Sequence, residues 1–239
     1  MNILILQHVP FEGPAVIRTW ATSNNHQLRC IDVSQTLELP SINSFDCLII
    51  MGGPMSVNDQ LTWMQGEMDL IRAAVNAKRY VIGICLGAQL IAASLAASIT
   101  ANQHREIGWF EAVYHLSPEQ ERTHRHWSSG IFPLQFTALH WHGDRFEIPP
   151  QATAIISSKA CDNQAFIVGE HTLALQFHLE FDRATAARVA QACQNELLEG
   201  GQYVQTEQQI LSNEQAFNDA NGLLFLLLDA MAKHFLASH

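Results

Sequence analysis

The sequence predicts an α/β protein with a mostly parallel sheet, helices on both faces of that sheet, and a helical appendage at the carboxyl end. Three observations support this fold class. Short apolar runs typical of buried strands alternate with helical patterns up to residue 97. Shorter strand patterns follow from residue 107 onward. A polar segment and an apolar helix complete the sequence.

The first elements are expected to alternate between buried strands and helices. Apolar runs predict strands at residues 3–6, 28–32, 47–51 and 80–84. Helical patterns predict helices at residues 15–22, after Pro14, and 64–76. Because such strands pair in parallel, ligands are expected beyond their carboxyl ends.

The second half should extend the sheet in a more antiparallel way and form the wall of a pocket. Strands are predicted at residues 109–114, 136–140, 153–157, 165–168 and 173–177. The polar stretch 117–130 is predicted to be a surface loop or a short helix. A helix over 183–198, with Asp182 as its N-cap, should close the main fold.

Length and composition favour one large domain with an appendage. The chain has 239 residues, of which 48% are hydrophobic, enough for one sizeable core. We assign residues 1–199 to the main domain and residues 200–239 to an extension packed on it. The extension is interpreted as two packed helices, the second over 223–235. A contact between two copies of the chain is the alternative.

The charge balance argues against a nucleic-acid surface. The chain has 13 Lys and Arg against 23 Asp and Glu, a net charge of -10, whereas phosphate binding depends on clustered basic residues. Five cysteines make an odd count without a C-x-x-C pair, so a reducing cytoplasm is the expected location. The first residues lack a basic stretch, so no secretory signal is expected. No membrane contact is expected, since the apolar run 223–228 is too short to span a bilayer.

Cys85 lies where the strand 80–84 meets the helical pattern 86–97. A strand-to-helix turn of this kind is tight and strained, and it needs small neighbours such as Gly83 and Gly87. The turn also places the sulfur at the amino end of a helix, where N–H groups and the dipole favour a thiolate. The pattern is therefore typical of a nucleophile, with a buried packing cysteine as the alternative.

His178 and Glu180 lie at the end of the strand predicted over 173–177. Side chains two residues apart in a strand point to one face, so the carboxylate can orient the imidazole. Combined with Cys85, the pair predicts a nucleophile, a base and an orienting acid. Alone, it is more typical of a solvated strand end.

Four blocks of the sequence resemble class I, triad-type glutamine amidotransferase domains. They are Gly52-Gly53-Pro54, the turn from Gly83 to Gln89, Trp141-His142-Gly143-Asp144, and Gln176-Phe177-His178-Leu179-Glu180. They follow the family's order over about residues 1–195. Met51 to Ser56 and Glu106 to Trp109 are similar to the amidotransferase domain of GMP synthetase. The resemblance implies a three-layer, flavodoxin-like fold.

The resemblance also implies a Cys-His-Glu triad made of Cys85, His178 and Glu180. Cys85 would form a glutamyl thioester, His178 would transfer protons, and Glu180 would hold the imidazole. Backbone N–H groups of Gly53 and Leu86 would stabilise the oxyanion. No cofactor is required for this chemistry.

The substrate-binding residues expected from the resemblance are Gly52, Gln89, His142, Gly143 and Asp144. Gly52 and Gly53 follow an apolar strand, where a Gly-Gly-Pro loop lets bare backbone approach a ligand. The alternative for this loop is an ordinary turn. The alternatives for the other two are a capping or core amide for Gln89 and a turn residue for Asp144.

Three functions stay open from the sequence. The first is a glutaminase or amidotransferase whose ammonia acceptor belongs to a synthetase partner chain. The second keeps the triad and hydrolyses gamma-glutamyl peptides or conjugates. The third is a non-catalytic regulatory relative, which an intact triad disfavours.

No metal site is expected, although two histidine pairs raise the question. His124 with His126, and His140 with His142, each place two imidazoles on one side of an extended segment, as in some zinc sites. Neither pair has a third ligand at a recognisable spacing, and the first pair lies in a polar stretch.

Overall fold

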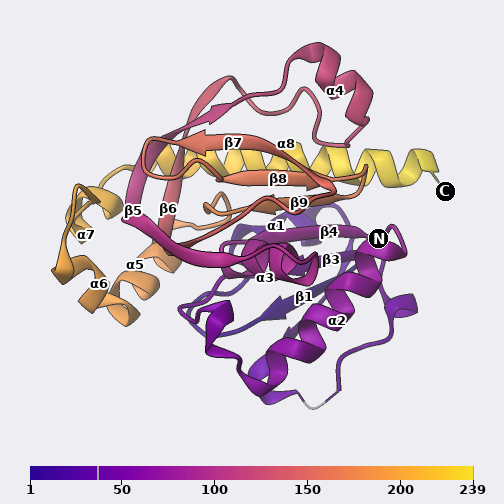
Figure 1. The fold of residues 1–239 in the computed structure, drawn as a ribbon, viewed down its shortest axis with the longest axis horizontal. Helices are drawn as coiled ribbons and strands as arrows, with labels where there is room; N and C mark the ends of the chain where they lie inside the picture. Colours follow the sequence, from indigo (N-terminus) through magenta and orange to yellow (C-terminus); the bar gives the residue numbers. More distant parts are fainter. Residues whose placement is uncertain (37, 239) are drawn as a thin grey trace.

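A single mixed sheet runs through the protein, and helices cover both of its faces (Figure 1). The structure is a computed structural model, and it describes residues 1–36 and 38–238. Within these residues the sheet has ten strands in the order β10-β5-β7-β8-β9-β4-β3-β1-β2, and β6 pairs with β5. The predicted fold class is confirmed.

The parallel half of the sheet holds the first strands of the chain. Its strands are β1 (Asn2–Gln7), β2 (Gln27–Asp32), β3 (Cys47–Ile50), β4 (Tyr80–Ile84) and β9 (Thr172–Leu175). Its helices are α1 (Val16–Ser23), α2 (Thr62–Asn76) and α3 (Leu86–Ser94), with short 3-10 turns at Val33–Gln35, Ile42–Ser44 and Val57–Asp59. Because β9 lies beside β4, the segment after β9 is brought to the turn after β4.

The other half of the sheet is mostly antiparallel and carries the carboxyl-terminal segments. Its strands are β5 (Ile99–Tyr114), β6 (Gln135–Phe146), β7 (Ala152–Ser158), β8 (Ala165–Val168) and β10 (Tyr203–Val204), which pairs in parallel with β5. The remaining helices are α4 (Pro118–His124), α5 (Arg183–Ala192), α6 (Gln194–Glu199), α7 (Glu207–Leu211) and α8 (Glu214–Ser238).

Two apolar clusters fill the space between the sheet and its helices. One includes Ile71 of α2 and Leu90 of α3, and the other includes Trp20 of α1 and Leu224 of α8. Each strand of the parallel half contributes alternate residues to both clusters, as a sheet buried on both faces requires.

β5 and β6 are longer than the sequence pattern predicts. They form a ribbon paired from Ile99 and Phe146 to Val113 and Gln135, with a register shift between Ala101 and Glu106. Pairing over this length extends the strands into polar residues that have little strand tendency alone. As a result, His142, Gly143 and Asp144 lie within β6. α3 is shorter than predicted and ends at Ser94, before Ala96 adopts a left-handed conformation (φ 68°).

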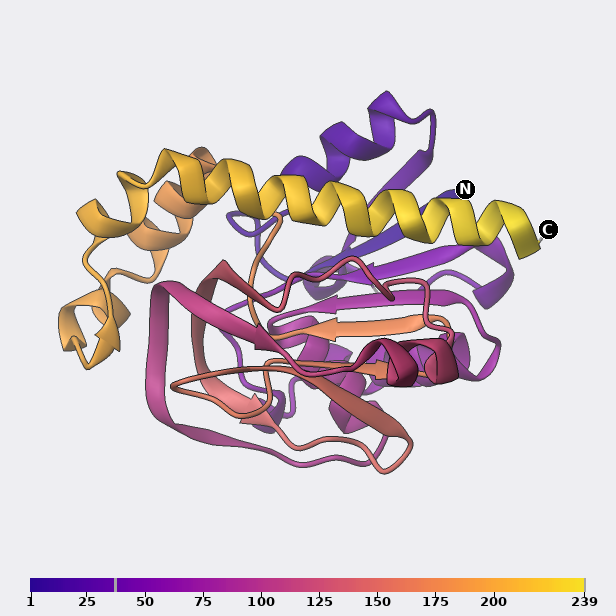
Figure 2. The ribbon, with the colours of Figure 1, turned by 90° about the horizontal axis from the view of Figure 1, so that it is seen from above.

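The tail contains the two predicted helices, but the second is much longer than expected. α8 lies along one side of the molecule (Figure 2). By length and composition α8 could cross a membrane. The expectation of no membrane contact considers only the short apolar run 223–228, which is a small part of this helix. Its buried side chains, among them Phe217, Leu224 and Leu228, join the core, which is typical of a helix packed on a sheet. Asp229 accepts a hydrogen bond of 2.7 Å from Trp20 Nε1 of α1.

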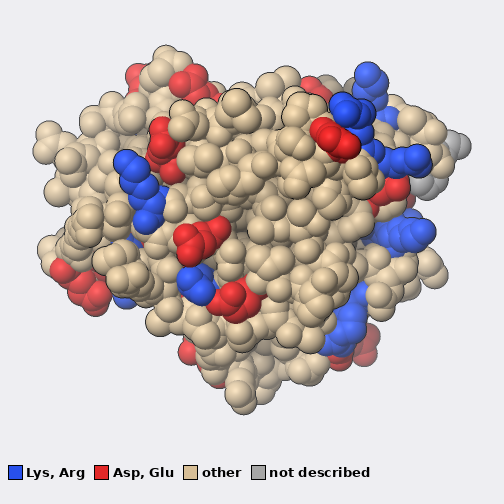
Figure 3. Space-filling model, turned by 45° about the horizontal axis from the view of Figure 1, so that its top comes forward, with Lys and Arg blue, Asp and Glu red and all other residues tan. Residues whose placement is uncertain are grey.

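Charged side chains are interspersed on the face shown in Figure 3, and most of that face is uncharged. The basic groups toward its right edge have acidic groups among them.

Close backbone packing fixes the turn after β4. Adding a methyl group at Gly87 tests this packing. A Cβ on Gly87 would lie 2.2 Å from the Ile50 carbonyl oxygen of the neighbouring strand. We therefore expect Gly87→Ala to lower the free energy of unfolding by about 1–3 kcal/mol or more, measured by urea denaturation. Gly66→Ala in α2 is the matched control, because a Cβ there meets nothing within 4 Å. It should stabilise the protein by about 1 kcal/mol. Equal stability of Gly87→Ala and the unmodified protein would contradict this packing.

Candidate active site

Cys85 occupies the strained turn between β4 and α3. Its φ of 53° lies in the left-handed region, which a residue with a Cβ rarely adopts. Its backbone N–H donates to the Leu175 carbonyl at 2.8 Å, which ties the turn to the end of β9. Strain of this kind persists only where the surrounding structure holds it, and it is concentrated at functional sites.

His178 and Glu180 follow β9 and face the turn of Cys85. His178 Nδ1 and Glu180 Oε1 are 2.7 Å apart, and both side chains are fully buried. The thiol of Cys85 and the imidazole of His178 line the same cavity and influence each other's pKa. The structure therefore brings the three residues predicted as a triad close together. The thiol also lies 3.5 Å from the Trp141 carbonyl oxygen of β6.

The pKa values of the thiol and the imidazole are governed by burial and by each other. Burial raises the pKa of the Cys85 thiol, and the hydrogen bond and charge of His178 offset this only in part. Burial also disfavours a charge on His178, yet the Glu180 carboxylate and the hydrogen bonds to Cys85 and Glu180 hold its pKa well above the usual value. The sequence suggested a thiolate favoured by the helix end. Instead, the N–H of Leu86 contributes less than His178 does.

A cavity of about 220 Å³ opens above the thiol. Seven of the predicted site residues line it: Gly53, Cys85, Gln89, His142, Gly143, Asp144 and His178. Glu180 and Leu86 are fully buried and are not among its lining residues. A cavity smaller than the roughly 300–1,000 Å³ of drug-sized pockets suits a ligand such as one amino acid.

Gly52 lies beneath the cavity and is not among its lining residues. Its carbonyl lies 2.9 Å from His8 Nδ1. A Cβ at this position would lie 1.8 Å from Glu12 Oε1 and 3.2 Å from His178 Cε1. Gly52 thus lets Glu12 and His178 approach each other, while its predicted contact with substrate stays a prediction.

Glu12 is a residue of the site that sequence reasoning missed. Its side chain is 5% exposed and lines the cavity beside His178. Burial raises its pKa to about 7. The charge of His178 lowers the pKa, and the charge of Glu180 raises it further. The only available signal was its position in the loop after the carboxyl end of β1, where ligands of parallel sheets collect.

The rim of the cavity contains charges of both signs. Arg105 Nη1 lies 3.8 Å from Glu196 Oε1 and 3.2 Å from Glu199 Oε2. Glu196 also accepts a hydrogen bond of 2.8 Å from Trp141 Nε1. Arg105 borders Gly143, since a Cβ there would lie 3.5 Å from its Nε. Arg105 and Glu196 were not predicted, because neither belongs to a recognised block.

The predicted substrate residues are held by hydrogen bonds within the wall. Gln89 Nε2 donates to Gln176 Oε1 at 3.1 Å, which joins α3 to the segment after β9. Asp144 Oδ2 accepts a hydrogen bond of 2.6 Å from Ser56 Oγ. His142 Nδ1 lies 2.9 Å from the Asp144 carbonyl oxygen. These bonds orient the polar groups toward one space.

Glu180→Gln should move the ionisation of Cys85 to higher pH. The carboxylate stabilises the imidazolium that accompanies the thiolate, and without it His178 loses its proton at lower pH. The thiolate then forms only under more alkaline conditions. We expect the midpoint of Cys85 alkylation by a neutral reagent, followed by mass spectrometry against pH, to rise in Glu180→Gln. Glu170→Gln removes the same charge at an exposed position and should leave the midpoint unchanged. An unshifted midpoint in Glu180→Gln would refute this coupling.

Comparisons with known proteins agree on one family. A family model described as glutamine amidotransferase class-I matches residues 17–192. The glutamine amidotransferase-like protein YfeJ of Salmonella typhimurium is 30% identical over 203 residues, which are 82% of this chain and 83% of that protein. One subunit of a glutamine-hydrolysing GMP synthase from Sulfurisphaera tokodaii is 30% identical over 58% of this chain and 69% of its own length. Gamma-glutamyl peptidase 3 of Arabidopsis thaliana is 23% identical over 59% of this chain and 57% of its own length.

Solved structures show the same fold. A glutamine amidotransferase from Methylobacillus flagellatus superimposes with a TM-score of 0.89 at 28% identity, covering 97% of this chain and 94% of that one. A glutamine amidotransferase from Thermotoga maritima gives a TM-score of 0.83 at 26% identity and covers 97% of both chains.

Proposed function

This chain belongs to the class-I glutamine amidotransferase family, and we propose that it hydrolyses the side-chain amide of glutamine through a thioester on Cys85. One observation carries this proposal. The Cys85 thiol lines a cavity of amino-acid size together with the His178 imidazole, which is itself 2.7 Å from Glu180. A strained cysteine, an oriented base and an adjacent cavity are what amide hydrolysis by a thiol requires.

In the proposed reaction the Cys85 sulfur attacks the amide carbonyl as His178 takes the thiol proton. The C–N bond then breaks, and His178 returns the proton to the departing ammonia. Water attacks the resulting thioester, again with His178 as base, and releases glutamate and the free thiol. N–H groups of Leu86 and Gly53 serve as oxyanion donors, each typically worth about 3 kcal/mol of barrier. Glu180 holds the imidazole and stabilises its cation.

We assign the amino-acid end of the substrate to the rim of the cavity. Arg105 beside Gly143 supplies a cation for the α-carboxylate, and Asp144 and Glu196 supply carboxylates for the α-ammonium group. Gln89 and His142 orient this wall through their hydrogen bonds. Glu12, beside His178, lies where the leaving ammonia or the attacking water would pass.

We place the acceptor of the ammonia on a separate chain. Two relatives that are named as subunits of glutamine-hydrolysing GMP synthases resemble this chain over more than half its length. The proposed partner is a synthetase chain that receives ammonia from the cavity. We also propose a cytoplasmic location, where glutamine-dependent synthesis would use the ammonia.

A second candidate is the hydrolysis of gamma-glutamyl peptides by the same residues. The similarity to gamma-glutamyl peptidase 3 favours it. The two reactions share the thioester and differ only in the leaving group, which is ammonia in one and an amine of a peptide in the other.

Turnover of free glutamine and of gamma-glutamyl dipeptides separates the two candidates. We expect glutamine to release ammonia and glutamate, and Cys85→Ser to abolish turnover of every substrate while the protein stays folded by circular dichroism. A strong preference for dipeptides would favour the second candidate. Undiminished turnover by Cys85→Ser would refute both.

A further inference from the structure

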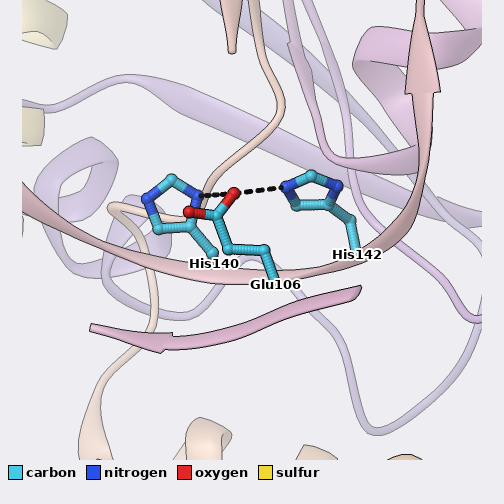
Figure 4. Close-up of side chains that lie close together, drawn as sticks. All are labelled: Glu106, His140 and His142. Carbon is cyan, nitrogen blue, oxygen red and sulfur yellow. Dashed lines mark ion pairs between the residues drawn. The ribbon is translucent and has the colours of Figure 1, made fainter. Parts of the chain in front are cut away.

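Three side chains that can bind a metal ion or a proton meet on one face of the β5–β6 ribbon (Figure 4). Glu106 of β5 pairs directly with His142 of β6, and His140 pairs with Gly108. Because side chains two residues apart share a face of a strand, both imidazoles project to the side on which Glu106 lies. Gly108 has no side chain, and the side chain of Gln205 occupies the position that a Cβ there would take.

The three side chains are buried and incompletely hydrogen-bonded. Glu106 and His140 are 0% exposed, and His142 is 5% exposed. Glu106 Oε2 lies 3.3 Å from His142 Nε2 and 3.5 Å from His140 Nδ1. Among residues 1–36 and 38–238, neither His140 Nδ1 nor Glu106 Oε1 has a hydrogen-bond partner. A buried polar atom without a partner costs free energy, so this arrangement suggests an absent binding group.

Two imidazoles and a carboxylate are a donor set that zinc and similar ions prefer. The three ligand atoms lie within 4.8 Å of one another. With metal–ligand bonds of about 2.0–2.2 Å, neighbouring ligands of a tetrahedral ion are separated by roughly 3.3–3.5 Å. The separations of Glu106 Oε2 from both imidazoles, 3.3 and 3.5 Å, match that value.

The surroundings of the three residues also suit a metal ion. Gln164 Nε2 donates to Glu106 Oε2 at 2.7 Å and lies 3.3 Å from His142 Nε2, while its Oε1 is without a partner among the described residues. A half-turn of this amide would present its oxygen as a fourth ligand.

We propose that Glu106, His140 and His142 bind a divalent transition-metal ion, with Zn²⁺ as the best fit and Gln164 as a fourth ligand. The sequence offered no third ligand for the His140–His142 pair, since Glu106 comes from a different strand. A second cavity, lined by Glu106, Phe110 and Lys159 among others, lies next to the site. The ion would fix the segment of β6 whose Trp141 carbonyl contacts the Cys85 thiol.

Metal titration of the full chain tests this site independently of catalysis. The protein carries Cys85→Ser, so that no thiol is available to bind the ion together with His178, and it is treated with a chelator that is then removed. We expect one equivalent of Zn²⁺ to bind in competition with a chromophoric chelator. One equivalent of Co²⁺ should give visible absorption without a thiolate charge-transfer band.

Glu106→Gln and His140→Gln, each in that background, should weaken Zn²⁺ binding by more than the roughly 10–100-fold that loss of an outer-sphere partner causes. His124→Gln, which removes a histidine outside the ribbon, should leave the affinity unchanged. Absence of stoichiometric binding by the parent protein would overturn the proposal whatever the variants do. Full binding by folded Glu106→Gln and His140→Gln would also overturn it, because the ion would then occupy another site.

Discussion

The buried contact between His178 and Glu180 is the interaction on which the candidate site depends. A carboxylate with no exposure requires a charged or hydrogen-bonded partner, and the imidazole at 2.7 Å provides one. That contact fixes the ring, which lines the same cavity as Cys85. It also raises the pKa of His178, so the ring can hold a proton next to a thiol that burial would otherwise keep neutral. The pair therefore supplies the activation that the helix end alone does not.

Sheet topology explains how residues distant in the sequence reach this contact. β4 and β9 are neighbours, so the turn after one strand meets the segment after the other. Close packing at Gly83 and Gly87 then holds Cys85 in its left-handed conformation beneath the cavity. On the other side, the β5–β6 ribbon supplies the wall with His142, Gly143 and Asp144. The cavity thus lies where the parallel and antiparallel halves of the sheet meet.

The predictable features were those encoded in short stretches of sequence. The glycine-bracketed turn of Cys85, the alternation that places His178 and Glu180 together, and the order of strands and helices all depend on near neighbours. The rest depends on tertiary pairing. Glu106 lies near His140 because of the register between β5 and β6. The length of these strands could not be predicted, since they extend into polar residues. Glu12 enters the cavity from an irregular loop. The pKa of the Cys85 thiol is raised because the thiol is buried, and no local sequence pattern specifies that burial.

The central claim is that Cys85 is the nucleophile at the floor of a glutamine site. Peptide mass spectrometry after exposure to a glutamine analogue with a diazoketone in place of the side-chain amide tests it most directly. The account predicts one adduct, on Cys85, formed more slowly when free glutamine is present. The absence of an adduct on Cys85 would contradict it. An adduct on Cys85 that glutamine does not slow, with another cysteine reacting equally well, would contradict it too.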